Sequence, residues 1–224
     1  LPLKGASLYI NNITIGTVTD DNGEFSLGLF AAGTYEVIAS YVGYTPILYT
    51  AKIKTAGYRI IFKLEPKEKK LREILILTDE TRRKYIELFK KNVLGFTDGA
   101  ARCRIRNIDE VQFMPGDTKD EFLAYADIEL VIDNPDLGYV IRFELLDFYY
   151  NLAKGSTYFF GYTRYEEMSK EGKAKKRHLR RRKQVYEGST MHFFRSLVKK
   201  DLSRQGFEVL QIIQDPKKAA DSIV

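Results

Sequence analysis

Residues 34–42, with the sequence TYEVIASYV, decide the fold of the N-terminal region. Successive side chains of a β-strand point to opposite faces of the sheet, so odd- and even-numbered residues separate. One face then carries Tyr35, Val37, Ala39 and Tyr41, and the other carries Glu36, Ile38, Ser40 and Val42. This segment is therefore predicted to be a β-strand that follows a turn at Ala32-Gly33.

Turn residues divide the flanking sequence into more short strands. Asn11-Asn12 suits a tight hairpin, because asparagine tolerates positive φ, and residues 20–23 (DDNG) reverse the chain again. The other predicted strands are residues 8–10, 13–18, 24–27, 47–53 and 58–64. Six short strands with frequent turns predict an all-β sandwich over residues 1–64.

Residues 65–70 (EPKEKK) are charged and contain a proline, which is typical of a linker between packed units. Residues 71–224 are predicted to form an α+β domain with an antiparallel sheet. Its predicted strands are residues 71–77, 104–113, 122–132, 139–150, 157–162 and 207–213, the central four forming a meander.

Two or three helices are predicted in the second domain, of which two can be placed. Thr78 or Asp79 caps the first, whose apolar residues recur at three- and four-residue spacing, and Gly95 ends it. The second follows Gly188-Ser189 and ends at Gly206. Its apolar stripe consists of Met191, Phe194, Val198 and Leu202, which is predicted to face a core.

Four motifs in the N-terminal region carry a family resemblance. They are residues 2–10 (PLKGASLYI), 16–27 (GTVTDDNGEFSL), 32–35 (AGTY) and 40–44 (SYVGY). Together they resemble the carboxypeptidase-regulatory-like domain of exported Bacteroidetes proteins. The resemblance implies a prealbumin-like or immunoglobulin-like sandwich and a periplasmic or cell-surface location. Family members begin with an additional strand of the type I-x-G-x-V-x-D, so we expect the sequence to start inside the domain.

The second region also contains motifs that resemble the part following this sandwich in a set of uncharacterised Bacteroidetes proteins. They include residues 134–139 (NPDLGY), 159–162 (FFGY) and 186–197 (YEGSTMHFFRSL). The resemblance implies no activity.

A zinc carboxypeptidase needs a His-x-x-Glu pair and a distant histidine. The only two histidines, His178 and His192, are not followed by such a glutamate. The missing zinc ligands argue strongly against carboxypeptidase activity, and we expect no metal and no cofactor. The single cysteine, Cys103, rules out an intrachain disulfide.

Ser189 and His192 are the nearest approach to a nucleophile and base. The alternative is that Ser189 caps the second helix, and the absence of a G-x-S-x-G motif favours this interpretation. A hydrolase using Ser189 and His192 is retained as an alternative function.

The net charge of +6 is concentrated in one segment. Nine cations lie within residues 170–183, whereas residues 1–164 are nearly neutral. Clustered cations attract polyanions, so this segment is a candidate site for a polyanion or glycan. The candidate residues are Lys175, Lys176, Arg177, Arg180, Arg181, Arg182 and Lys183. A solvated helix face or a mobile loop is the alternative, and without interleaved aromatic residues we expect no nucleic-acid binding.

Three further features have a functional and a structural interpretation. Residues 20–23 suggest calcium, but they lack the spaced ligands of an EF-hand loop and are predicted to be a turn. Cys103 lies between two arginines, yet a lone cysteine beside a strand is usually buried. The aromatic runs at 148–150 and 158–165 pack in the core or face a partner.

The sequence therefore predicts a non-catalytic exported module for binding or assembly. We expect its partner to be a protein or glycan at the cell envelope. No run of about 18–20 apolar residues is present, so we expect no transmembrane helix.

Overall fold

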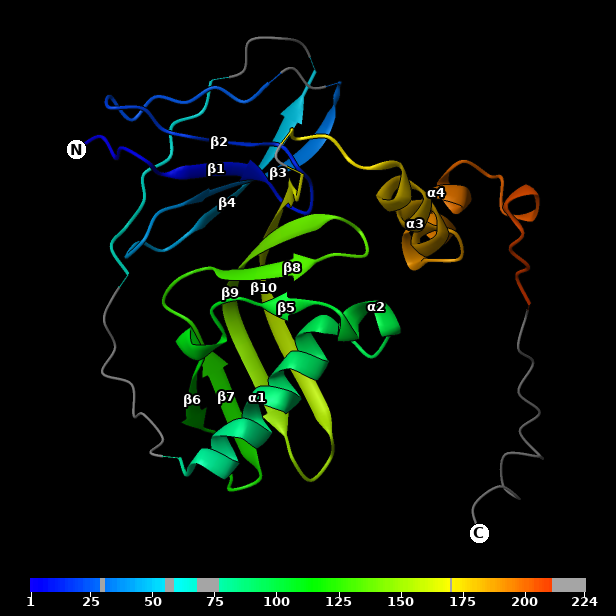
Figure 1. Ribbon diagram of the computed structural model, residues 1–224. Helices are drawn as coiled ribbons and strands as arrows, with labels where there is room; N and C mark the ends of the chain where they lie inside the picture. Colours follow the sequence, from blue (N-terminus) through cyan, green and yellow to red (C-terminus); the bar gives the residue numbers. More distant parts are fainter. Residues whose placement is uncertain (29–30, 55–58, 68–76, 170, 211–224) are drawn as a thin grey trace, which may run out of the picture. The chain divides into compact units, whose positions relative to one another are not determined.

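The computed structural model describes residues 1–28, 31–54, 59–67, 77–169 and 171–210 (Figure 1). Its internal contacts group into two compact units. The N-terminal unit is Leu1–His178 and the C-terminal unit is Leu179–Val224. Part of the expected linker at 65–70, and the expected strand at 71–77 except Leu77, lie outside the described residues. The domain division at this linker stays a prediction.

The N-terminal unit begins with a four-stranded antiparallel sheet in the order β2-β1-β3-β4. Its strands are β1 (Ser7–Ile10), β2 (Gly16–Val18), β3 (Gly33–Ser40) and β4 (Ile47–Ile53). Asn12 adopts φ 65° in the β1–β2 turn, as predicted from its residue type. The alternation along β3 is also confirmed, because Val37 and Ala39 pack on one side and Ile38 on the other.

A second layer covers the Val37 face of this sheet. It consists of residues 24–28 and 59–64, in which half-buried and exposed side chains alternate as they do in strands. Phe25 and Phe62 meet over the buried Ala39, with ring centroids 6.1 Å apart. The sandwich is confirmed, but the expected strands at 24–27 and 58–64 are wrong over their described residues, which form no strand. Alternation predicts which face is buried, but a strand also needs hydrogen-bonded neighbours.

The rest of the N-terminal unit is built on a six-stranded antiparallel sheet, which confirms the predicted α+β class (Figure 1). Its strands are β5 (Arg104–Ile105), β6 (Gln112–Pro115), β7 (Glu121–Tyr125), β8 (Leu130–Asn134), β9 (Tyr139–Asn151) and β10 (Ser156–Glu167). The long strand β9 pairs with β10 along one edge and with β8 and then β7 along the other. The predicted order of the meander is confirmed. The first predicted strand pairs with the second through β5–β8 and β6–β7, the second with the third through β7–β9 and β8–β9, and the third with the fourth through β9–β10. The predicted strands at 104–113 and 122–132 are each divided in two.

Helix α1 (Asp79–Leu94) covers one face of this sheet (Figure 1). The hydroxyl of Thr78 accepts a hydrogen bond from Thr81 N at 3.3 Å, and Gly95 ends the helix with φ 95°. Both predicted caps are confirmed. Phe89 of α1 is fully buried against Phe148 of β9, with ring centroids 4.8 Å apart.

Three more short α-helices follow in the part of the chain that the structure describes. A single turn, α2 (Asp98–Ala101), precedes β5, while α3 (Lys176–Tyr186) and α4 (Thr190–Val198) follow β10. In the C-terminal unit, the rings of Tyr186, His192, Phe193 and Phe207 form a small aromatic cluster. None of the described helices combines the length and the apolar character needed to cross a bilayer.

The prediction that the apolar stripe of the last helix faces a core is wrong. Met191, Phe194 and Val198 are exposed, whereas His192 and Ser196 are buried. The helix ends at Val198, so Leu202 does not continue the stripe. Residues 207–210 form no strand, and 211–213 lie outside the described residues.

Candidate functional site

The geometry around Ser189 supports its role as a helix cap. Its Oγ accepts a hydrogen bond from His192 N at 3.2 Å. The His192 ring bonds elsewhere: Nδ1 accepts from Gly188 N at 3.1 Å, and Nε2 lies 3.1 Å from Gln205 Oε1. Because Nδ1 accepts a hydrogen bond, the ring proton is on Nε2, which donates a hydrogen bond to Gln205 Oε1. A base that activates serine must bond the serine oxygen, and both ring nitrogens are engaged with other groups.

We expect Ser189→Ala to lower the free energy of unfolding by about 0.5–2 kcal/mol, because one N-terminal N–H of α4 loses its acceptor. Urea denaturation measures this loss. Thr190→Ala is the matched control, because Thr190 is exposed in the first turn and is not the cap residue. Disappearance of a measurable esterase rate in Ser189→Ala, with the fold retained, would overturn the capping role.

The seven basic candidate residues lie on α3 or immediately before it. His178 is buried, and Arg182 and Tyr186 are half-buried at four-residue spacing, so this side of α3 faces inward. The other six candidates are exposed. Arg181 donates to Gln184 Oε1 at 3.4 Å, and Lys183 Nζ lies 3.8 Å from Glu187 Oε1. A surface of this kind attracts anions by charge, and its use as a binding site stays a prediction.

A polar hollow of about 560 Å³ lies in the C-terminal unit beside His192. Its lining residues are Lys183, Tyr186, Glu187, Gly188, His192, Arg204 and Gln205. The cations Lys183 and Arg204 each lie near a carboxylate, of Glu187 and Asp201 respectively. The hollow therefore combines hydrogen-bonding groups with nearly balanced charge.

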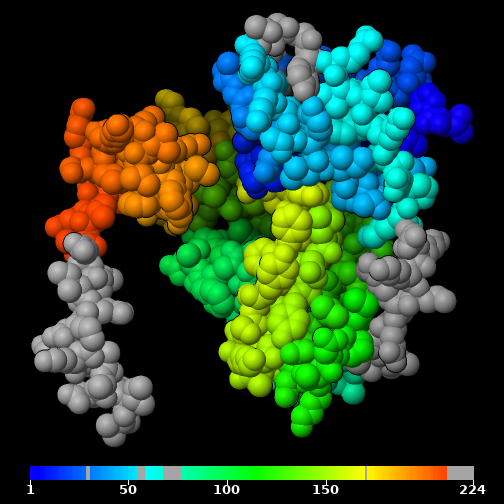
Figure 2. All heavy atoms as spheres, turned by 180° about the vertical axis from the view of Figure 1, so that it is seen from behind, coloured from blue at the N-terminus to red at the C-terminus, as the bar shows by residue number. Residues whose placement is uncertain are grey.

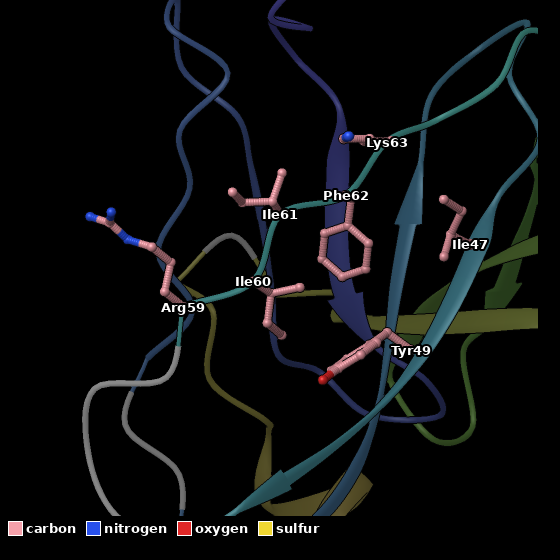
Figure 3. Close-up of a pocket in the computed structure, with 7 residues that line it drawn as sticks. All are labelled: Ile47, Tyr49, Arg59, Ile60, Ile61, Phe62 and Lys63. Carbon is pink, nitrogen blue, oxygen red and sulfur yellow. The ribbon is translucent and has the colours of Figure 1, made fainter.

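A second hollow, of about 310 Å³, lies in the sandwich between β4 and residues 59–63 (Figure 3). Tyr49 and Phe62 meet edge to face there, with centroids 6.2 Å apart, and Arg59 extends away from them. The remaining lining residues are Ile47, Ile60, Ile61 and Lys63. This composition suits an apolar group and offers no pair of acid and base.

The side chain of its first residue, Asp20, stabilises the turn at residues 20–23. Asp20 Oδ1 accepts from Asn22 N and Glu24 N, both at 2.9 Å, and Gly23 adopts φ 74°. The turn interpretation is confirmed. Across the described residues, no group of three or more His, Cys, Asp or Glu side chains is placed to hold a metal ion.

Cys103 is half-buried beside the core and donates to Gly99 O at 3.4 Å. Burial raises the pKa of its thiol, and the nearby Asp136 carboxylate raises it further against the opposing effect of Arg102. Burial and Asp136 therefore outweigh Arg102, and the shift favours the protonated thiol over the thiolate.

The two predicted aromatic runs have different surroundings. Phe148 is completely buried, whereas Tyr158, Phe159 and Phe160 are exposed on β10. Core packing accounts for the first, and a partner-facing surface formed by the others stays a prediction.

Sequence reasoning missed a cluster of charged residues between the two sheets of the N-terminal unit. Tyr9 and Ile38 of the first sheet pack on Tyr162 of β10. Figure 2 shows the blue atoms of the first sheet next to the yellow atoms of β10. Beside them, the Tyr9 hydroxyl donates to Glu144 Oε2 at 3.4 Å. Arg142 bonds both Glu129 and Glu166 at 2.7 Å, and Arg164 bonds Glu129 at 3.2 Å.

The edge of β10 is also bonded to the β1–β2 turn. Asn12 N donates to Thr163 O at 2.8 Å, and Tyr165 N donates to Ile13 O at 3.1 Å. Asn11 Oδ1 accepts from Thr163 N at 3.1 Å. These bonds cover an edge that would otherwise expose unpaired backbone groups.

Glu144 is expected to make stability depend on pH. Burial raises the pKa of this carboxyl, the charge of Glu129 adds to the shift, and hydrogen bonds from Ser40 and Tyr9 oppose it. The folded protein therefore binds the proton more tightly than the unfolded chain does. The resulting stabilisation is complete below the ordinary carboxyl pKa and is lost as the pH rises through the raised value.

We expect Glu144→Gln to gain stability relative to the wild type as the pH rises from about 4 to about 7. Urea midpoints of both proteins at the two pH values measure the change. Glu110→Gln, at an exposed position, is the control and should show no such trend. A constant difference between Glu144→Gln and the wild type would contradict the role of Glu144.

Comparison with known families supports the family resemblance of the N-terminal region. Residues 1–76, about a third of the chain, match the family model described as the CarboxypepD_reg-like domain. The resemblance noted in the sequence is confirmed for this segment, whose family is a non-catalytic β-sandwich. No curated protein and no solved structure matched the chain.

Proposed function

We propose that the chain is a non-catalytic module for binding or assembly that works at the periplasm or cell surface. The match of residues 1–76 to a regulatory-like sandwich carries this proposal. The arrangement around Ser189 supports it, because the serine and His192 form a helix cap and not a catalytic pair. The partner is a protein or a glycan of the cell envelope.

Fractionation of the cells that produce the full-length protein tests the location. We expect the protein to be released with the periplasm, or to be cleaved by protease added to intact cells. Recovery in the cytosol, with protection from the protease in spheroplasts as well, would contradict the proposal. A serine-directed activity probe that labels the wild type but not Ser189→Ala would favour the hydrolase.

A second candidate function is the binding of a polyanion or glycan through the basic residues of α3. The exposed cations on one short helix support it. Retention of the protein on heparin and on immobilised lipopolysaccharide tests it. We expect the triple variant Arg180→Ser, Arg181→Ser, Arg182→Ser to elute at lower salt, because fewer counterions are released on binding.

The matched control for this variant removes three exposed cations of α1, in Arg83→Ser, Lys84→Ser, Lys91→Ser. The net charge of the two triple variants is the same. Equal loss of retention in both would show that total charge, and not the segment, determines the binding.

A further inference from the structure

Helix α4 exposes its apolar side and buries a polar one. Met191, Phe194 and Val198 recur at spacings of three and four residues, so they lie along one side of the helix. Their exposed fractions are 56%, 55% and 83%. The opposite side carries the buried His192 and Ser196. Leu197, which is also exposed, widens the apolar stripe.

Cations flank one side of this apolar stripe and are frequent in the sequence around it. Arg195 and Lys199 are exposed beside the stripe, on the side toward His192. Residues 179–210 contain eight Lys and Arg but three Asp and Glu. Two of the three acids lie near cations of the unit, Glu187 near Lys183 and Asp201 near Arg204. The C-terminal unit thus combines an exposed apolar stripe with a large excess of positive charge.

We propose that the C-terminal unit docks on an anionic lipid surface, with the stripe of α4 inserted among the headgroups and the cations beside lipid phosphates. An interfacial helix of this kind joins apolar residues on one side to lysine and arginine around them. Each cation near an anionic leaflet adds to the attraction. The inference rests on the second candidate function, since it names the anionic surface that the basic segment meets.

The positive charge of the unit and its exposed apolar side chains favour a lipid surface over two other occupants, a soluble polyanion and a second copy of the unit. A soluble polyanion uses the cations alone and leaves Met191, Phe194 and Val198 in water. A second copy of this unit would place its excess positive charge against an equal excess, which opposes association. An anionic bilayer satisfies both the apolar and the charged groups.

The absence of tryptophan from the chain permits a direct test. In Phe194→Trp the single indole reports the polarity around the stripe. We expect its emission to shift to shorter wavelength on vesicles of phosphatidylcholine that contain about a third phosphatidylglycerol. We expect no shift on pure phosphatidylcholine vesicles or with heparin.

Further substitutions in Phe194→Trp separate the apolar contribution to vesicle binding from the contribution of the cations. Met191→Ser with Val198→Ser should weaken vesicle binding about tenfold, and so should Arg180→Ser with Lys183→Ser. The control is Phe96→Ser, which removes an apolar side chain that is 81% exposed in the N-terminal unit. It should leave binding unchanged. All these positions are exposed, and circular dichroism checks that each variant is folded.

The outcomes distinguish this inference from the second candidate function. Heparin retention through α3 without any emission shift on anionic vesicles would overturn lipid docking and leave polyanion binding in place. If neither heparin retention nor the emission shift is observed, polyanion binding and lipid docking are both overturned. A blue shift that grows with protein concentration in the absence of vesicles would assign the stripe to a second copy and overturn the inference.

Discussion

Replacing Phe122 by alanine is expected to lower the free energy of unfolding by about 3–5 kcal/mol. Phe122 of β7 is completely buried and lies at the centre of the aromatic core under α1. Its ring stacks on Tyr85 with centroids 4.0 Å apart and meets Phe113 at 5.6 Å and Tyr150 at 5.4 Å. The substitution removes apolar contacts and leaves a cavity that the packed neighbours on α1, β6 and β9 cannot fill.

Urea denaturation measures this loss, with Phe96→Ala as the control. Phe96 is largely exposed between α1 and α2, so its removal should change stability by less than about 0.5 kcal/mol. Similar losses in the two variants would show that Phe122 is not in a packed core.

Gly138→Ala is expected to cost about 2–5 kcal/mol, because two effects combine at this position. Gly138 adopts φ 69° in the β8–β9 turn, a left-handed conformation that alanine adopts at a cost. In addition, a Cβ atom there would overlap the ring of His178. His178 is buried, so its ring cannot move aside without disturbing its surroundings.

Gly155→Ala separates the two effects. Gly155 has φ 62°, but nothing lies within 4 Å of the position of its Cβ, so only the conformational cost of about 1–2 kcal/mol applies. The double variant Gly138→Ala, His178→Ala should show a favourable coupling in a double-mutant cycle. Equal losses for Gly138→Ala and Gly155→Ala would contradict the predicted overlap.

Local sequence patterns predicted those elements whose cause is local. The caps of α1 at Thr78 and Gly95, the β1–β2 turn at Asn12 and the two faces of β3 depend on residues within a few positions of one another. Strand pairing is not local, and so the sequence did not predict that residues 24–28 and 59–64 would lack strand neighbours. The order of the strands in the second sheet was predicted, but the breaks that divide residues 104–113 into β5 and β6, and residues 122–132 into β7 and β8, were not.

The candidate sites show the same contrast between features with a local cause and features that depend on residues far apart in the sequence. Ser189 was predicted correctly as a cap, because its acceptor role depends on His192 three residues later. The charged cluster was missed, because Tyr9 and Glu144 are 135 positions apart and only the packing of two sheets brings them together. The stripe of α4 was recognised by its spacing. Spacing alone, however, does not distinguish a side that faces a core from one that faces outward.

The backbone bonds between the β1–β2 turn and β10 have a mechanical consequence. Rotation of the first sheet against the second would break the Asn12–Thr163 and Tyr165–Ile13 bonds and expose Tyr9, Ile38 and Tyr162 to water. These contacts therefore oppose rotation of the two sheets against each other. A load applied to the sandwich by a bound partner would have to break them before the two sheets could separate.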